Sequence, residues 1–207
     1  MISFLISAIK IIFLLGFLIG IHETGHFLIA KLCKVRVNEF AIGFGPVIWK
    51  KQGKETKYEL RLIPLGGFVN MEGEAEQSEK EGSFTKASIP RRIAIVAAGA
   101  LVNIIFAIMV YFILAMTIRG NLTNAVVGNR VLDADNFGNR LYFASYNTKE
   151  FMLSIAESVK QLFTGKVSSA ELVGPVGISE VVAKTNGFRE FIYIMSAISI
   201  SLGVTNL

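Results

Sequence analysis

The chain has 207 residues, of which 52% are hydrophobic and 18% charged, with a formal net charge of +5. Soluble domains contain about 25% charged residues, so this composition excludes ordinary soluble, disordered and collagen-like proteins and favours a membrane protein, whose Lys and Arg gather in cytoplasmic loops. The single cysteine, Cys33, excludes an intramolecular disulfide and therefore a disulfide-stapled secreted scaffold.

The first predicted element is a membrane helix within residues 1–34. Twenty residues lie between Lys10 and Lys31. At about 1.5 Å per residue they extend roughly 30 Å, which is the thickness of a hydrocarbon core. A cleaved signal peptide would end a short apolar stretch at small residues, but here the helix continues into the polar residues 22–26. We therefore predict a retained span.

Residues 35–91 are predicted to form a cytoplasmic loop with a β-hairpin. Residues 31–92 carry 12 Lys and Arg, against 8 in residues 119–190, so the positive-inside rule places the first loop in the cytoplasm. Alternating patterns at 35–40 and 58–63 predict two strands, followed by Gly- and Pro-rich turns at 43–46 and 64–67. Two placements stay open. The hairpin lies either in the cytosol or, as a re-entrant element, beside the first helix, where it offers a strand edge to an extended substrate.

Two further apolar segments predict two more membrane helices. The second helix covers residues 92–119, and between its two terminal arginines it holds one strongly polar residue, Asn103. Residues 120–190 form a short extracytoplasmic region, in which 151–163 have the spacing of an amphipathic helix that lies on the membrane surface or against protein. The third helix covers 191–207, and because a terminal carboxylate at membrane depth is costly, we expect the sequence to stop inside it.

The predicted fold class is therefore a mainly α, polytopic membrane protein with three transmembrane helices and a small membrane-associated β element.

The residues that can carry chemistry lie in the first helix. The two histidines of the chain, His22 and His26, are four positions apart and share one helical face. Both imidazoles can then hold one Zn²⁺ at about 2.0–2.1 Å. Glu23 lies beside that face and can serve as general base. Burying two imidazoles and a carboxylate inside an apolar span carries a desolvation cost unless other interactions offset it. Zinc provides that compensation; the alternative is a polar cluster satisfied by neighbouring helices.

Asn103 and a third ligand complete the candidate site. An asparagine at mid-membrane either lies near the metal and orients substrate or joins helices through hydrogen bonds. A hydrolytic zinc site uses three protein ligands and an open position. The sequence has no third histidine, and Cys33 lies about 10 Å beyond His26 along the helix, which is too far. We expect the third ligand beyond residue 207.

Taken together, these motifs resemble the site-2 protease family of intramembrane zinc metalloproteases, and within it the bacterial branch of regulated intramembrane proteolysis. Residues 22–27 are similar to the family's HExGHF helix, 40–46 and 63–69 to its membrane-associated β region, and 174–178 to its run into the third helix. Residues 98–103 are similar to its second conserved helix, although Ala100 replaces a usual proline. Asn206 and Leu207 resemble the start of the motif whose aspartate is the third zinc ligand.

The resemblance implies a zinc-dependent endopeptidase of the bacterial inner membrane that cleaves anti-sigma factors or signal-peptide remnants within the bilayer. An upstream site-1-type protease would trim these single-span substrates first. Zn²⁺ is the implied cofactor, with His22 and His26 as metal ligands, Glu23 as catalytic residue and Asn103 at the substrate. No nucleic acid is implied as a partner.

The sequence departs from the family in two ways. The aspartate is absent, so the sequence as written is expected to be inactive. The bacterial branch usually carries a PDZ domain of roughly 80–100 residues, but only about thirty residues lie between Gly120 and Glu150, so this domain is expected to be missing.

Three other functions stay as alternatives. A non-catalytic scaffold would bind transmembrane segments. A metal transporter would show more than one cluster of intramembrane ligands. An anchored zinc protease with a water-exposed site would carry the motif after the span rather than within it.

Overall fold

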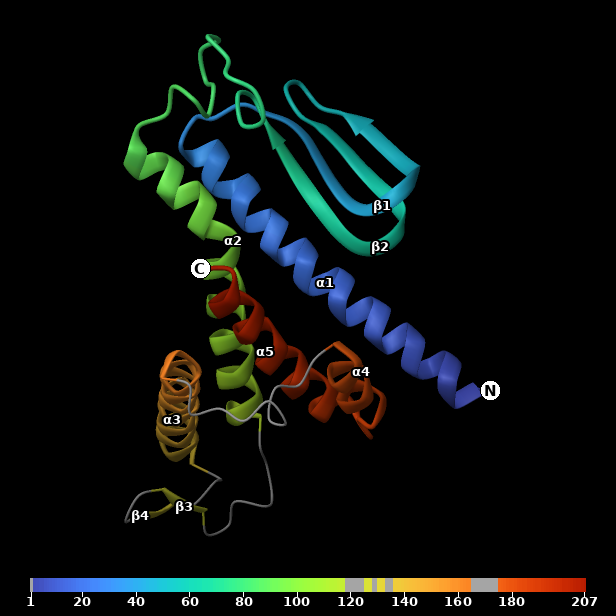
Figure 1. The fold of residues 1–207 in the computed structure, drawn as a ribbon. Helices are drawn as coiled ribbons and strands as arrows, with labels where there is room; N and C mark the ends of the chain where they lie inside the picture. The colour runs from blue at the N-terminus through green and yellow to red at the C-terminus, as the bar shows by residue number, and fades with distance from the viewer. Residues whose placement is uncertain (1, 118–124, 128–129, 133–135, 165–174) are drawn as a thin grey trace. The chain divides into compact units, whose positions relative to one another are not determined.

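A computed structural model of the chain describes residues 2–117, 125–127, 130–132, 136–164 and 175–207 (Figure 1). The elements are α1 (Ile2–Leu32), β1 (Val37–Gln52), β2 (Lys57–Met71), α2 (Ile89–Met116), β3 (Ala125–Val127), β4 (Arg130–Leu132), α3 (Phe137–Phe163), α4 (Pro175–Ala183) and α5 (Phe188–Thr205). Residues 4–32, α2 and α5 are long and apolar enough to cross a membrane. The predicted fold class, with three such helices and a small β element, is confirmed.

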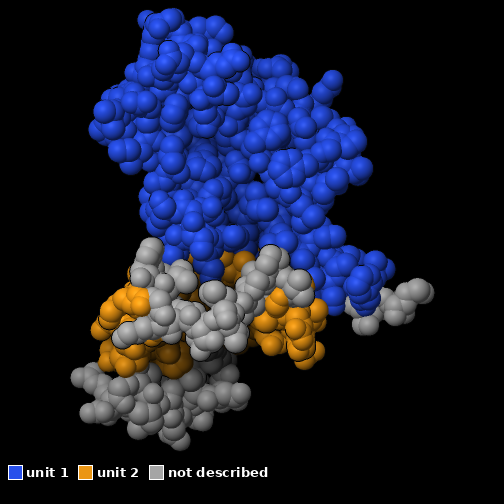
Figure 2. Space-filling view, viewed as in Figure 1, with its two compact units in different colours: residues 1–104, 201–207 blue, residues 105–200 orange. Residues whose placement is uncertain are grey.

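The chain forms two compact units (Figure 2). The first consists of residues 1–104 and 201–207, and the second of residues 105–200. Both α2 and α5 therefore continue from one unit into the other. The first unit contains the predicted zinc motif and the β-hairpin, and the second contains α3 and α4.

The two strands of the hairpin fold back on themselves. Residues 39–42 of β1 pair with 67–70 at the end of β2 and also with 57–60 at its start, while 49–52 pair with 57–60. The bends occur at Gly43, Gly45 and Gly66, whose φ angles of 91°, 80° and 138° are rarely adopted by residues with a side chain. The prediction of strand-ending turns at 43–46 and 64–67 was wrong, because both segments are bends inside longer strands.

The bent hairpin lies against the middle of α1, as Figure 1 shows. A Cβ added to Gly16 would overlap the carbonyl oxygen of Pro64, and one added to Gly20 would lie 3.9 Å from Ile42 Cδ1. Both glycines belong to the apolar stretch of α1. These contacts agree with the re-entrant placement, since a hairpin standing away in the cytosol would not reach this part of the helix.

A small apolar core joins the base of the hairpin to the end of α1 and the start of α2. It consists of Ala30, Val35, Val37, Met71 and Ile95, and Cys33 packs against it. Burial of these side chains fixes α2 beside α1 at the level of Ile95, one turn before the segment that faces the predicted metal ligands.

In the second unit, α3 is a longer helix than the predicted 151–163. The ring of Phe151 stacks on that of Tyr111 of α2 with the centroids 4.2 Å apart. This contact favours the protein-packed alternative for the amphipathic helix. Helix α4 begins at Pro175, a position where the missing N–H of proline costs no intrahelical hydrogen bond.

Candidate metal centre

The two histidines of α1 are placed as a pair of zinc ligands would be. Their Nε2 atoms are 3.2 Å apart, and the ring planes are inclined by 78°. Two nitrogens at about 2.0–2.1 Å from a tetrahedral zinc ion are separated by about 3.3–3.4 Å. The observed separation is close to this value, and imidazole is a preferred zinc ligand. The residues present therefore fit a zinc ion.

A backbone carbonyl of α2 orients His26. The Nδ1 atom of His26 lies 2.8 Å from the carbonyl oxygen of Ile95. A carbonyl can only accept, so Nδ1 carries the proton and donates it. The lone pair of the neutral ring then remains on Nε2, the atom that faces His22. Metal-binding histidines are usually held in this way by a partner on their other nitrogen.

Asn103 lies against the other histidine. It is 1% exposed, and its Nδ2 atom is 3.4 Å from Nδ1 of His22. The two ends of an amide have nearly the same shape. When Oδ1 faces the ring, it accepts the Nδ1–H of His22 and leaves Nε2 to a metal. The structure thus brings Asn103, from 81 residues further along the chain, into the candidate site.

Two glycines let α1 and α2 approach closely at this level. A Cβ on Gly25 would lie 2.7 Å from the carbonyl oxygen of Ala98. A Cβ on Gly99 would lie 2.5 Å from Nε2 of His26 and 2.7 Å from Nε2 of His22. Small residues at helix contacts are common in membranes, but Gly99 also keeps open the space into which both Nε2 atoms point. Its position one turn before Asn103 is the only sequence signal for this role.

Glu23 opens into a cavity of about 290 Å³ beside the histidine pair. The cavity is lined by Glu23, His26, Gly67, Phe68, Val69, Met71, Glu74, Ile95 and Val96. The final segment of β2 forms one wall, and Gly67 permits its approach, because a Cβ there would lie 3.0 Å from Glu23 Cγ. Sequence reasoning missed Glu74, which comes from the loop after β2 and belongs to no motif.

The structure brings together His22, Glu23, His26 and Asn103, all the residues predicted for the site. Over the described ranges of the chain, no group of three or more His, Cys, Asp and Glu side chains is placed to hold a metal. The two histidines are candidates for two of the ligands. The third ligand, expected beyond residue 207, stays a prediction.

Comparisons with known proteins give a consistent result. The model of peptidase family M50 matches residues 10–207. A Clostridium acetobutylicum protein named as a zinc metalloprotease is 29% identical over 268 residues, covering 93% of this chain and 79% of the relative. Protease RseP of Yersinia pestis is 32% identical over 203 residues, covering 92% of this chain and 44% of the relative. The regulator of sigma-E protease RseP of Escherichia coli is 43% identical over 118 residues, covering 55% of this chain and 26% of the relative.

Proposed function

Since the chain belongs to peptidase family M50, the site-2 protease family, we propose that it cleaves membrane-embedded substrates at a zinc ion held by His22 and His26. The observation that carries the proposal is the 3.2 Å separation of the two Nε2 atoms, next to a cavity that Glu23 lines. The relatives named as zinc metalloproteases support Zn²⁺ as the cofactor. The three apolar helices support an integral membrane protein.

When bound, zinc polarises a scissile carbonyl and lowers the pKa of water from about 15.7 towards 7. Glu23 does the proton work in this proposal. Its carboxylate accepts the proton of the attacking water and later delivers it to the leaving amine. His26, held by the carbonyl of Ile95, and His22, beside Asn103, keep their Nε2 atoms directed at the metal. Asn103 lies close enough to the pair to help orient substrate.

The cavity also supports an extended substrate. Residues 67–69 and Met71 of β2 line the cavity together with Glu23, and a strand offers backbone groups with which a peptide can pair. A transmembrane helix must unwind before its peptide bonds can be attacked, and such pairing would hold the unwound segment. We propose single-span proteins, such as anti-sigma factors or signal-peptide remnants, as substrates, each trimmed first by a site-1-type protease.

The chain's outer region is proposed to be shortened. The alignment with the Clostridium acetobutylicum relative runs over 268 residues, which exceeds the 207 residues of this chain. That relative therefore contains residues without a counterpart here. This supports the absence of a PDZ domain between α2 and α5, and with it a less restricted entry of substrates from the outer side. A multi-pass protein of the bacterial inner membrane fits the three spans and the bacterial relatives.

Cleavage of a tagged substrate tests the proposal. The complete coding sequence that contains residues 1–207 is co-expressed with a tagged single-span protein, as wild type and as Glu23→Gln. We expect a cleaved product from the wild type and none from the variant, with both proteins retaining zinc after purification. Cleavage that persists in Glu23→Gln would contradict the assigned role of Glu23. No cleavage and no zinc in the wild type would leave a scaffold that binds transmembrane segments.

A further inference from the structure

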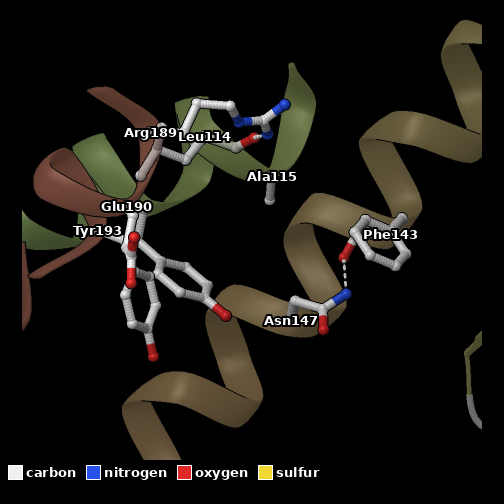
Figure 3. Close-up of a pocket in the computed structure, with 8 residues that line it drawn as sticks. Leu114, Ala115, Phe143, Asn147, Arg189, Glu190 and Tyr193 are labelled. Carbon is white, nitrogen blue, oxygen red and sulfur yellow. Dashed lines mark hydrogen bonds between the residues drawn. The ribbon is translucent and has the colours of Figure 1, made fainter. Parts of the chain in front are cut away.

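The second unit contains a cavity of about 390 Å³ that the proposed proteolysis does not use. It lies where α2 ends and α5 begins, with α3 as its third side. Figure 3 shows Arg189, Glu190 and Tyr193 of α5 on one side and Phe143 and Asn147 of α3 on the other. The lining residues are Tyr111, Leu114, Ala115, Phe143, Asn147, Arg189, Glu190 and Tyr193.

The cavity lies near the ends of two apolar helices, where a bilayer crossed by these helices would have its headgroups. Tyr111 is five residues before the end of α2 at Met116, and Tyr193 is five residues after the start of α5 at Phe188. Both tyrosines are therefore about 8 Å from the end of an apolar helix. Tyrosine is enriched at this interface because its ring is apolar and its hydroxyl is polar. Leu114 and Ala115, which are nearer the end of α2 than Tyr111, add apolar side chains to the lining.

The cavity presents one cation and one anion from adjacent positions. Arg189 donates a hydrogen bond from Nη2 to the carbonyl oxygen of Leu114 at 3.2 Å, which uses one of the five N–H donors of a guanidinium group. Glu190 accepts the backbone N–H of Asn186 at 2.7 Å through Oε2, and its second oxygen can accept further bonds. The rings of Tyr111 and Tyr193 lie 6.0 Å apart beside these charges.

We propose that this cavity binds the headgroup of a zwitterionic phospholipid, with the phosphate at Arg189 and the ammonium between Glu190 and the tyrosine rings. A guanidinium group matches the oxygens of a phosphate. A carboxylate and the faces of aromatic rings both attract an ammonium group. A phospholipid with a purely anionic headgroup has nothing to pair with Glu190, so the carboxylate disfavours it. The site would anchor the outer ends of α2 and α5, and it does not depend on proteolysis.

Lipid binding by the purified protein tests this proposal. The protein in detergent is mixed with equal amounts of dioleoyl phosphatidylethanolamine, phosphatidylcholine and phosphatidylglycerol, and the lipid adducts are counted by native mass spectrometry. We expect the zwitterionic lipids to bind about tenfold more tightly than phosphatidylglycerol, as one charge-assisted hydrogen bond implies. If the protein prefers phosphatidylethanolamine, the site selects a primary ammonium group. If it prefers phosphatidylcholine, the site selects a quaternary ammonium group.

Matched variants link the binding to the cavity. Arg189→Gln should weaken binding of all three lipids about tenfold. Glu190→Gln, which can still accept the N–H of Asn186, should remove the preference for zwitterionic lipids. Lys184→Gln, directly after α4, changes an exposed ion pair with Glu180; it is the control and should bind as wild type. If Arg189→Gln does not fold, the lipid preference of Glu190→Gln alone tests the proposal. Equal binding of the three lipids by the wild type, or a Glu190→Gln variant with unchanged preference, would overturn the proposal.

Discussion

Replacing Gly99 with alanine is expected to weaken zinc binding while leaving the helix intact. The position lies inside α2, where an alanine is about 0.8–1.0 kcal/mol more favourable than a glycine for an exposed helix. Helix propensity alone therefore predicts a neutral or stabilising change. The structure predicts a different result, because the added methyl group would occupy the space that both histidine Nε2 atoms face.

The size of the effect follows from the geometry. The new Cβ would lie 2.5 Å from Nε2 of His26 and 2.7 Å from Nε2 of His22, whereas ordinary contacts begin at 3.4 Å. The rings would have to move by about 0.9 and 0.7 Å, while zinc sites tolerate deviations of about 0.2 Å. The required movements therefore exceed that tolerance by about 3.5- to 4.5-fold. We expect the zinc affinity to fall at least as far as it does when an outer-shell partner of a ligand is lost, which is about 10- to 100-fold.

Zinc affinity and thermal stability are measured on the same purified samples. Affinity is obtained by competition with a chelator of known strength, and unfolding is followed by circular dichroism in detergent. Gly187→Ala is the matched control, since a Cβ at Gly187 meets nothing within 4 Å. The control should bind zinc as the wild type does.

Two results would refute this reasoning. If Gly99→Ala binds zinc with wild-type affinity, the histidine pair does not hold the metal in the space above Gly99. If it loses zinc only in proportion to a general loss of helical structure, the close contact between α1 and α2, rather than the metal space, accounts for the effect.

Three further predictions concern Glu23, Asn103 and Glu72. Glu23→Gln should lower proteolysis by about 10²- to 10⁴-fold and leave the zinc content unchanged, as judged by product formation and metal analysis. If the variant lost its zinc together with its activity, Glu23 would be a metal ligand rather than a general base. Asn103→Ala should weaken zinc binding about 10- to 100-fold in the same chelator competition, and unchanged affinity would show that Asn103 only joins helices. Hydrogen bonds from Ser78, Asn38 and Lys80 lower the pKa of Glu72 from 4.5 to about 2. The ionised Glu72 carboxylate therefore contributes fully to stability when the pH is above its pKa in the unfolded chain. This contribution is lost as the pH falls through its pKa in the folded protein. The melting temperatures of wild type and Glu72→Gln should differ most above pH 4.5 and converge near pH 2; a constant difference would contradict the ionised contact.

The spans and the histidine pair could be predicted from sequence because each depends on local geometry. The thickness of the bilayer sets the length of an apolar helix, so α1, α2 and α5 follow from hydropathy. The period of the helix places His22 and His26 on one face, so the metal pair follows from a spacing of four.

The remaining features depend on contacts between distant segments. The Gly-rich segments at 43–46 and 64–67 carry local turn signals, yet the strands continue through them, because residues 39–42 pair on both sides and Pro64 packs on Gly16. The role of Gly99 appears only when α2 lies against α1. Glu74 reaches the cavity from a loop whose path is set by β2. The sequence of each of these segments does not by itself indicate which other segment it contacts in the folded chain.

The most direct test of the account is zinc K-edge X-ray absorption of the purified protein loaded with one equivalent of Zn²⁺. The account predicts two imidazole nitrogens at about 2.0–2.1 Å from the metal in the wild type, and loss of this imidazole signal in the His22→Ala/His26→Ala variant. An imidazole signal that persists in the double variant, or a wild-type spectrum without imidazole scattering, would contradict the zinc site and the proteolysis built on it.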